Sequence, residues 1–321
     1  MSDYEPIELR GYYRAGHSTV WELADAAGIL GQLNMKLASL EFTESSAKAE
    51  AALFEGRVEF VSGNHISPYK HVAQNKPIVC LASPGNQVRD LVVTRKPIES
   101  VLELKGKRVA DTAIEDPIGG YHHIRGNHML EVVQGGLDID DVDWLVIADY
   151  MGEEFRRAQF EAMRSGQADA TFVTGATNDF EAAGLHVHKL DAMPMVTGPT
   201  ITTSVQTLQD KDRLGERLLK AYLLTVNFAR AQPEMAQKLL GSGGQPAEGV
   251  RRGNRAASVA RMPLRPYPDN QAVANAYELC CMQYPEAKAI SPLALWDTHY
   301  LRDLDLAGFI QELEAEGPAA R

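Results

Sequence analysis

The sequence of 321 residues is poor in cysteine and carries no excess of basic residues. Its three cysteines, Cys80, Cys280 and Cys281, are odd in number and two are adjacent, which favours a reducing compartment over a disulfide framework. Neither cysteine nor histidine has the spacing of a metal site, so we expect no metal. Lys and Arg number 32 against 43 Asp and Glu, and a net charge of −11 argues against a nucleic-acid partner.

Long hydrophobic runs are also missing from the sequence. No apolar stretch reaches the roughly 18 residues of a membrane-spanning helix, so we expect no membrane insertion. Before the first strand pattern there is no basic segment followed by an apolar one, so no signal peptide is visible. We therefore expect a cytoplasmic protein, or a periplasmic one if a leader has been removed from this sequence.

What the sequence does contain is a regular alternation of short strand and helix patterns. Strands are predicted at Ile7–Tyr13, Met35–Phe42, Val58–Val61, Ile78–Ala82, Leu91–Thr94, Arg108–Ala110, Trp144–Ile147, Ala170–Val173 and His186–Leu190. Helices are predicted between them at 18–30, 45–55, 67–74, 121–133 and 153–164. This alternation indicates an α/β fold whose mixed sheets are flanked by helices.

From Asp212 onward the pattern is almost wholly helical. Helices are predicted at 212–231, 233–240, 271–284 and 293–311. The stretch between Gly241 and Pro268 is rich in Gly, Pro and Arg, and we interpret it as a surface loop.

The chain is long for one hydrophobic core, because cores stop growing at about 250–300 residues. An internal echo also indicates two lobes: residues 51–60 (AALFEGRVEF) resemble residues 161–170 (EAMRSGQADA), 110 positions later. Each segment has a helix, a glycine stop, an acidic residue three positions on and the start of a buried strand. We expect two lobes built on similar βαβ units, with chance similarity as the alternative.

Four short motifs occur along the chain in this order: WELADAAGIL at 21–30, ALFEGRVEF at 52–60, KPIV at 76–79 and LELKGKRVA at 102–110. Together they resemble the nitrate/sulfonate/taurine-binding and thiamine-pyrimidine-synthase (SsuA/THI5-like) group of type II periplasmic-binding-protein-like proteins. The resemblance runs from about Ile7 to about Leu240. It implies two lobes with a ligand cleft between them: 1–95 in lobe one, 96–198 in lobe two, and 199–321 returning to lobe one with the C-terminal helices.

In lobe one, two strand-to-helix turns are expected to present the ligand groups. In the first, His17 could bind an anion as imidazolium or move a proton, and Ser18 either caps the helix or binds an acid oxygen. In the second, Ser67 is the expected N-cap of a helix that Pro68 opens. The candidate residues of the two turns are Arg14, His17, Ser18, Thr19, Asn64, His65 and Ser67.

In lobe two, a third turn has paired glycines before a helix, which lets backbone N–H groups approach an anion closely. Its candidate residues are Gly119, Gly120, Tyr121, His122 and His123. Adjacent histidines on a helix point about 100° apart, so at most one of them faces the ligand. Thr174 holds the place of the Asn64–His65 pair in the internal echo and is a further candidate, whereas His128 has no special context.

Two functions fit this sequence, and whether the chain is an enzyme stays open at this stage. We expect a small anionic organic acid as ligand, and favour slightly a cytosolic, cofactor-independent lyase of decarboxylase type, with His17, His65, His122 or His123 as proton donors. The alternative is the substrate-binding protein of a nitrate/sulfonate/taurine-type ABC transporter, with a permease as partner. The chain departs from the known enzymes of the group: no cysteine lies at a cleft turn, and Ser67 stands at the place of the donor histidine. Neither specific reaction is therefore transferred.

Overall fold

The computed structural model describes residues 4–14, 16–114, 123–149, 153–242 and 254–315, and the chain divides into two compact units. Unit 1 holds the described residues up to Asn86 and those from Val196 onward, and unit 2 holds Gln87–Met195. The chain leaves unit 1 within β5 (Gly85–Val88) and returns within β11 (Met193–Thr197), and these two strands pair with each other.

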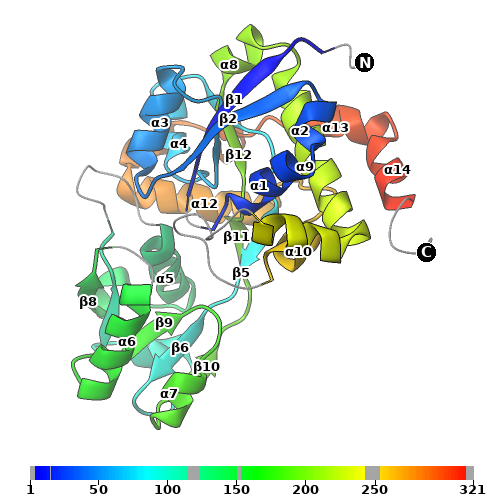
Figure 1. Cartoon of the computed structure of the whole chain (residues 1–321). Coiled ribbons are helices and arrows are strands. Elements are labelled where there is room, and N and C mark those ends of the chain that lie inside the picture. The colour runs from blue at the N-terminus through cyan, green and yellow to red at the C-terminus, as the bar shows by residue number, and fades with distance from the viewer. Residues whose placement is uncertain (1–3, 15, 115–122, 150–152, 243–253, 316–321) are drawn as a thin grey trace. The chain divides into compact units, whose positions relative to one another are not determined.

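The sheet of unit 1 has the strand order β2-β1-β3-β12-β4. Its strands β1, β2 and β12 are labelled in Figure 1. Its strands are β1 (Ile7–Tyr13), β2 (Met35–Phe42), β3 (Phe60–Ser62), β4 (Ile78–Cys80) and β12 (Ile201–Ser204). β1 pairs in parallel with both β2 and β3, whereas β12 runs antiparallel to β3 and β4. The carboxyl ends of β1 and β3 therefore lie side by side.

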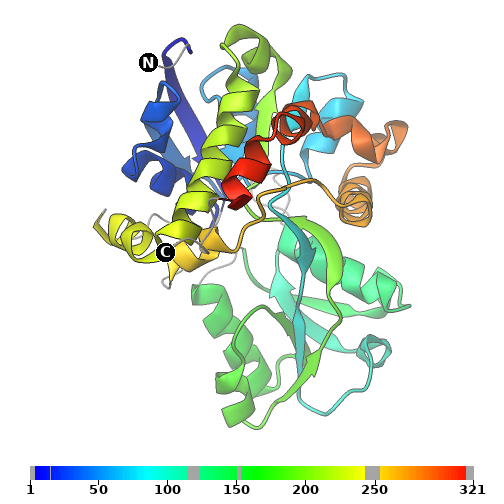
Figure 2. The ribbon, with the colours of Figure 1, turned by 90° about the vertical axis from the view of Figure 1, so that its right-hand side faces the viewer.

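Helices of unit 1 surround this sheet and bury a large apolar core. The first four are α1 (Thr19–Ala26), α2 (Ile29–Gln32), α3 (Ser46–Phe54) and α4 (Pro68–Ala73). After β12 follow α8 (Val205–Asp210), α9 (Leu214–Ala231), α10 (Pro233–Ser242), α11 (Arg255–Ala260), α12 (Asn270–Gln283), α13 (His299–Leu306) and α14 (Phe309–Ala315). The long helix α9 runs beside α13 and α14 (Figure 2). In the core, the rings of Trp21 and Phe60 are fully buried, and their centroids lie 4.5 Å apart.

Unit 2 has its own five-stranded sheet, in the order β10-β6-β9-β7-β8. The strands are β6 (Leu91–Thr94), β7 (Arg108–Thr112), β8 (Asp143–Ala148), β9 (Ala170–Val173) and β10 (His186–Lys189), and the helices are α5 (His123–Gln134), α6 (Glu153–Ser165) and α7 (Asn178–Ala182). Apolar clusters cover both faces, one around Phe172 and the other around Phe180. The predicted α/β class is confirmed: both sheets are mixed and both are flanked by helices.

The internal echo corresponds to the same local structure in both units. Gly56 and Gly166 end their helices with φ of 66° and 81°, the left-handed region that glycine tolerates. Three residues later, the Glu59 carboxylate accepts a hydrogen bond from Arg10 N at 2.6 Å, and the Asp169 carboxylate accepts one from Arg108 N at 3.1 Å. Each acidic residue thus ties the start of its strand to the neighbouring parallel strand, as expected for repeated βαβ units.

Three predictions about the elements were wrong in detail. The helix expected at 18–30 is broken at Gly28, whose φ of 71° ends α1 before α2 begins. The helix expected at 293–311 is a 3-10 turn (Pro292–Leu295) followed by α13 and α14, with Gly308 at φ 85° between the last two. The stretch expected to be a loop contains α11, because Ala256 and Val259 are buried in the core of unit 1.

Candidate functional site

The turns after β1 and β3 are joined to each other by hydrogen bonds. Arg14 N donates to Ser62 O at 3.0 Å, which extends the pairing of the two strands by one residue. The Ser62 hydroxyl donates to His17 O at 2.7 Å and accepts a hydrogen bond from the indole nitrogen of Trp21 at 3.1 Å. The residues that follow β1 are therefore held against the end of β3, as parallel strands predict.

His17 lies directly on the backbone of Gly63. A Cβ added at Gly63 would stand 2.2 Å from Cδ2 of His17, and the φ of Gly63 is 87°. Gly63 N donates to Thr200 O at 3.0 Å, which fixes the glycine to the segment before β12. Only glycine satisfies both the positive φ and the close approach of the imidazole.

His65 and Arg14 form a group of nitrogen-bearing side chains with the half-buried His17. Nδ1 of His65 lies 3.4 Å from the hydroxyl of Thr200, and both His65 and Arg14 are buried. Burial and the positive charge of Arg14 lower the pKa of His17 to about 4. Burial, the neighbouring His17 and Arg14 lower the pKa of His65 to about 3, against an opposing contribution from the Val196 backbone. At neutral pH both imidazoles are uncharged, and Arg14 supplies the positive charge of the group.

Ser18 stands at the N-cap position of α1, the first helix after β1. Its φ and ψ are −84° and −29°, and its side chain makes no cap hydrogen bond. The residue is fully buried, and within the described part of the chain its hydroxyl has no hydrogen-bond partner. Thr19, also buried, begins the helix. The turn after β1 therefore combines a buried cation, an unused hydroxyl and the positive end of an eight-residue helix.

Asn64 and Ser67 lie in the turn after β3, but their side chains bond to Glu50 of α3. Asn64 Nδ2 donates to Glu50 Oε1 at 3.1 Å, and the Ser67 hydroxyl donates to the same oxygen. Ser67 is the N-cap residue of α4, as predicted, although its side chain makes no cap hydrogen bond. Glu50 and His71, its partner on α4, were missed because no local pattern marks a carboxylate that becomes buried.

In unit 2, the exposed residue Thr174 follows the end of β9, and its hydroxyl donates to Asp90 Oδ1 at 2.8 Å. The other carboxylate oxygen of Asp90 lies 3.8 Å from Nε2 of His128, whose Nδ1 bonds to Asp111 at 2.8 Å. The imidazole also stacks on Phe172, with ring centroids 4.6 Å apart. Burial opposes the charged form of His128, but the carboxylates of Asp111 and Asp90 outweigh it and raise its pKa. His128 is thus held by two buried carboxylates and an aromatic ring, an environment that its place in the sequence does not reveal.

The remaining candidates belong to the third turn. Gly119, Gly120, Tyr121 and His122 lie outside the described residues. His123 begins α5, and its side chain is likewise outside the description. The ligand roles predicted for these residues stay predictions.

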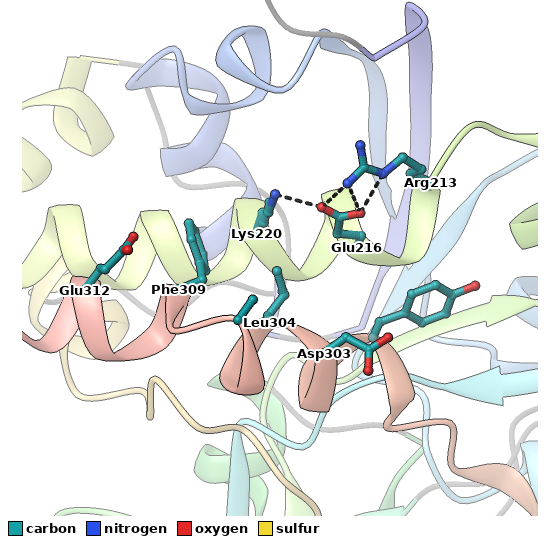
Figure 3. Close-up of a pocket in the computed structure, with 9 residues that line it drawn as sticks. Arg213, Glu216, Lys220, Asp303, Leu304, Phe309 and Glu312 are labelled. Atoms are coloured by element: carbon teal, nitrogen blue, oxygen red, sulfur yellow. Dashed lines mark hydrogen bonds and ion pairs between the residues drawn. The ribbon is translucent and has the colours of Figure 1, made fainter.

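A surface hollow of about 450 Å³ lies between α9 and the two C-terminal helices of unit 1 (Figure 3). Three of its charged side chains pair with one another: Glu216 bonds to Arg213 at 2.7 Å and to Lys220 at 2.7 Å. Leu304 and Phe309 also line it. The hollow contains none of the residues predicted for the site.

The family model described as NMT1/THI5 like matches residues 33–236, nearly two thirds of the chain. The chain belongs to the NMT1/THI5-like family. No curated protein matches it in sequence.

Solved structures with the same fold have low sequence identity to this chain. The putative periplasmic sulfonate-binding protein SsuA of Methylobacillus flagellatus KT is 14% identical, with a TM-score of 0.66, covering 96% of this chain and 97% of its own. The periplasmic aliphatic sulphonate binding protein SsuA of Escherichia coli is 19% identical, with a TM-score of 0.59 and 88% of each chain covered. The periplasmic nitrate-binding protein NrtA of Synechocystis PCC 6803 is 10% identical, with a TM-score of 0.61, covering 99% of this chain and 93% of its own. Identities this low establish the two-lobed periplasmic-binding-protein fold alone.

None of the helices among the described residues is both long and apolar enough to cross a lipid bilayer. No three or more of the His, Cys, Asp and Glu side chains of these residues are arranged to hold a metal ion.

Proposed function

We propose that this protein binds a small organic anion, a sulfonate or a carboxylate, and serves as the substrate-binding protein of an ABC-type uptake system. The single observation that carries the proposal is the group formed by Arg14, His17, Ser18 and His65 at the adjacent ends of β1 and β3. The fold supports it, since relatives with the same fold are named as sulfonate- and nitrate-binding proteins.

The chemistry of this group suits an acid group of single negative charge. The Arg14 guanidinium offers a planar set of N–H donors that matches the oxygens of a carboxylate or a sulfonate. The Ser18 hydroxyl and the first N–H groups of α1 are further donors, and the helix dipole favours a negative charge there. The neutral imidazole of His17 can donate one hydrogen bond without adding charge.

The preference for a decarboxylase-type lyase is not carried into this proposal. That mechanism needs a histidinium that gives its proton to carbon near neutral pH. With pKa values of about 4 and about 3, His17 and His65 hold no such proton at pH 7. A group of binding donors around one cation fits their state better.

Location and partner follow from the proposed role. A substrate-binding protein delivers its ligand to a transporter permease, so the proposal places the chain outside the cytoplasmic membrane. The cytoplasmic location expected from the sequence is the competing prediction. Fractionation of cells that express the natural gene, followed by immunoblotting of the periplasmic and cytoplasmic fractions, distinguishes the two.

The test of binding is isothermal titration calorimetry with ethanesulfonate and benzoate. We expect at least one of these anions to bind unchanged, and Arg14→Gln to weaken its binding about tenfold or more. Arg57→Gln is the matched control, because Arg57 is an exposed arginine of the same unit paired with exposed Glu55. Equal binding by wild type and Arg14→Gln would exclude the proposed site. If chromatography showed that the protein consumes the ligand over hours, the lyase function would be favoured instead.

A further inference from the structure

We propose that Glu50, a buried carboxylate of α3, is the positioning residue that holds His65 in the anion site. Glu50 does not itself belong to the group of Arg14, His17, Ser18 and His65. It acts through the turn that carries His65, and this inference rests on the proposed function of that group as a binding site.

The two oxygens of Glu50 divide their partners between a turn and a helix. Oε1 accepts hydrogen bonds from Asn64 and from Ser67, the residues that flank His65 in the turn after β3. Oε2 lies 2.8 Å from Nε2 of His71 and 3.6 Å from Nζ of Lys70, both on α4. One carboxylate thus ties the turn to the first part of the helix that follows it.

The charge state of Glu50 supports this arrangement. The residue is only 1% exposed, and burial opposes its ionised form. The hydrogen bond with His71 and the charge of Lys70 more than offset burial, so the pKa of Glu50 is lowered and it stays a carboxylate. An ionised acceptor makes the bonds to Asn64 and Ser67 stronger than a neutral one would.

The position of His65 follows from these bonds. Asn64 and Ser67 turn their side chains to Glu50, whereas His65, between them in sequence, has its imidazole at Thr200 and within reach of the charge of Arg14. The carbonyl of Asn64 is held as well, because it accepts a hydrogen bond from the hydroxyl of Thr202 on β12. The turn is therefore fixed on both sides of His65, and the orientation of the turn directs the imidazole to the anion site.

The proposal is tested with Glu50→Gln, which keeps the shape of the side chain but removes its charge and one acceptor. The imidazole ¹³C and ¹⁵N resonances of His65 are recorded at pH 7 without ligand and assigned with His65→Asn. We expect these resonances to move in Glu50→Gln, while those of His128 in unit 2 stay in place. We also expect the Kd for ethanesulfonate, and for benzoate measured in parallel, to rise about tenfold.

Two further variants keep the test decisive. Ser67→Ala removes one of the two bonds to the turn and leaves the pairing of Glu50 with His71 and Lys70, so it serves if Glu50→Gln does not fold. Glu59→Gln is the matched control: Glu59 is an equally buried carboxylate, but it is paired with Arg10 and Lys211 at the start of β3 and, among the described residues, makes no bond to the turn after that strand. We expect Glu59→Gln to leave the His65 resonances and the Kd unchanged.

The outcomes separate this inference from the proposed function. His65 resonances that stay in place in both Glu50→Gln and Ser67→Ala overturn the positioning role, and so does an unchanged Kd. A wild-type protein that binds neither anion, together with shifted His65 resonances in the variants, instead refutes the proposed function and shows that Glu50 orients the turn for another purpose.

Discussion

The imidazole of His17 lies so close to Gly63 that a Cβ on the glycine would approach Cδ2 of His17 to 2.2 Å. The two residues come from different strand-to-helix turns, so this contact fixes the distance between the turns. We expect Gly63→Ala to displace His17, because the alanine methyl group and the imidazole cannot occupy the same space. Together with the positive φ, the substitution should cost roughly 1–3 kcal/mol of stability and weaken anion binding.

Chemical denaturation and calorimetry measure these two effects, and Gly56→Ala is their control. Gly56 also has a positive φ, of 66°, but nothing lies within 4 Å of an added Cβ. It should therefore show the backbone strain and no loss of binding. If both variants bind equally well, the contact between Gly63 and His17 does not matter for the site.

Ser18→Ala is expected to affect binding and stability in different ways. Within the described residues the buried hydroxyl has no partner, so its removal should leave the melting temperature unchanged or slightly higher. If the hydroxyl donates to the bound anion, the Kd should rise by roughly three- to tenfold. Thermal denaturation without ligand and calorimetry with ethanesulfonate give the two values. A clear loss of stability without a change in Kd would mean that Ser18 has a structural partner.

The low pKa values of His17 and His65 predict a loss of stability in mild acid. In the unfolded chain both histidines take up protons below about pH 6.5, whereas in the folded protein they do so only near pH 4 and pH 3. The free energy of unfolding should therefore fall as the pH is lowered from 6.5 towards 4, by at most about 1.4 kcal/mol per pH unit for each histidine.

The measurement compares urea denaturation of wild type and His65→Asn at pH 7, 6 and 5. The variant should lose less stability over this range than the wild type. The comparison is made between two chains because Glu131, whose pKa burial and Asp90 raise to about 7, acts in the opposite direction in both. Parallel curves for the two proteins would mean that His65 is not held in its neutral form.

Anion binding should be coupled to proton uptake by the same histidines. A negative charge placed beside His17 and His65 favours their charged forms and raises their pKa values. We therefore expect ethanesulfonate to bind more tightly at pH 5.5 than at pH 7.5. Calorimetry in buffers of different ionisation enthalpy counts the protons directly, and a pH-independent Kd without proton uptake would contradict the prediction.

In unit 2, Asp111→Asn should be strongly destabilising. It removes the charge that His128 contacts at 2.8 Å and leaves a buried imidazole without its main partner. Breaking a buried pair of this kind costs about 3–5 kcal/mol. Glu161→Gln, which disrupts an exposed ion pair with Arg164 on α6, is the control and should change stability by less than about 1 kcal/mol. Chemical denaturation compares the two, and similar values would show that His128 does not depend on Asp111.

The sequence predicts most of the fold because local patterns decide it. Several strands, among them β1, β2 and β9, have the bounds that the pattern predicts, since alternating or continuous apolar residues mark them. β12 was missed: its residues Ile201–Ser204 read as a polar Thr-rich stretch, and only the neighbours on either side make it a buried strand.

The candidate site was predictable to the extent that strand ends determine it. The positions of Arg14, His17 and His65 after two parallel strands follow from the strand pattern, and the structure brings the three together. The partners of these turns were not predictable. Glu50 lies on a helix among alanines, and its burial against the turn after β3 depends on the packing of α3, which no local signal reports.

The place of β12 in the sheet of unit 1 determines the order in which the chain can be assembled on the ribosome. β12 separates β3 from β4, yet it is synthesised only after the whole of unit 2. Unit 2 is a continuous segment and can therefore fold while the first sheet still lacks an inner strand and its long helix α9. The N-terminal segment is synthesised first, but the sheet of unit 1 cannot be completed until β12 has left the ribosome.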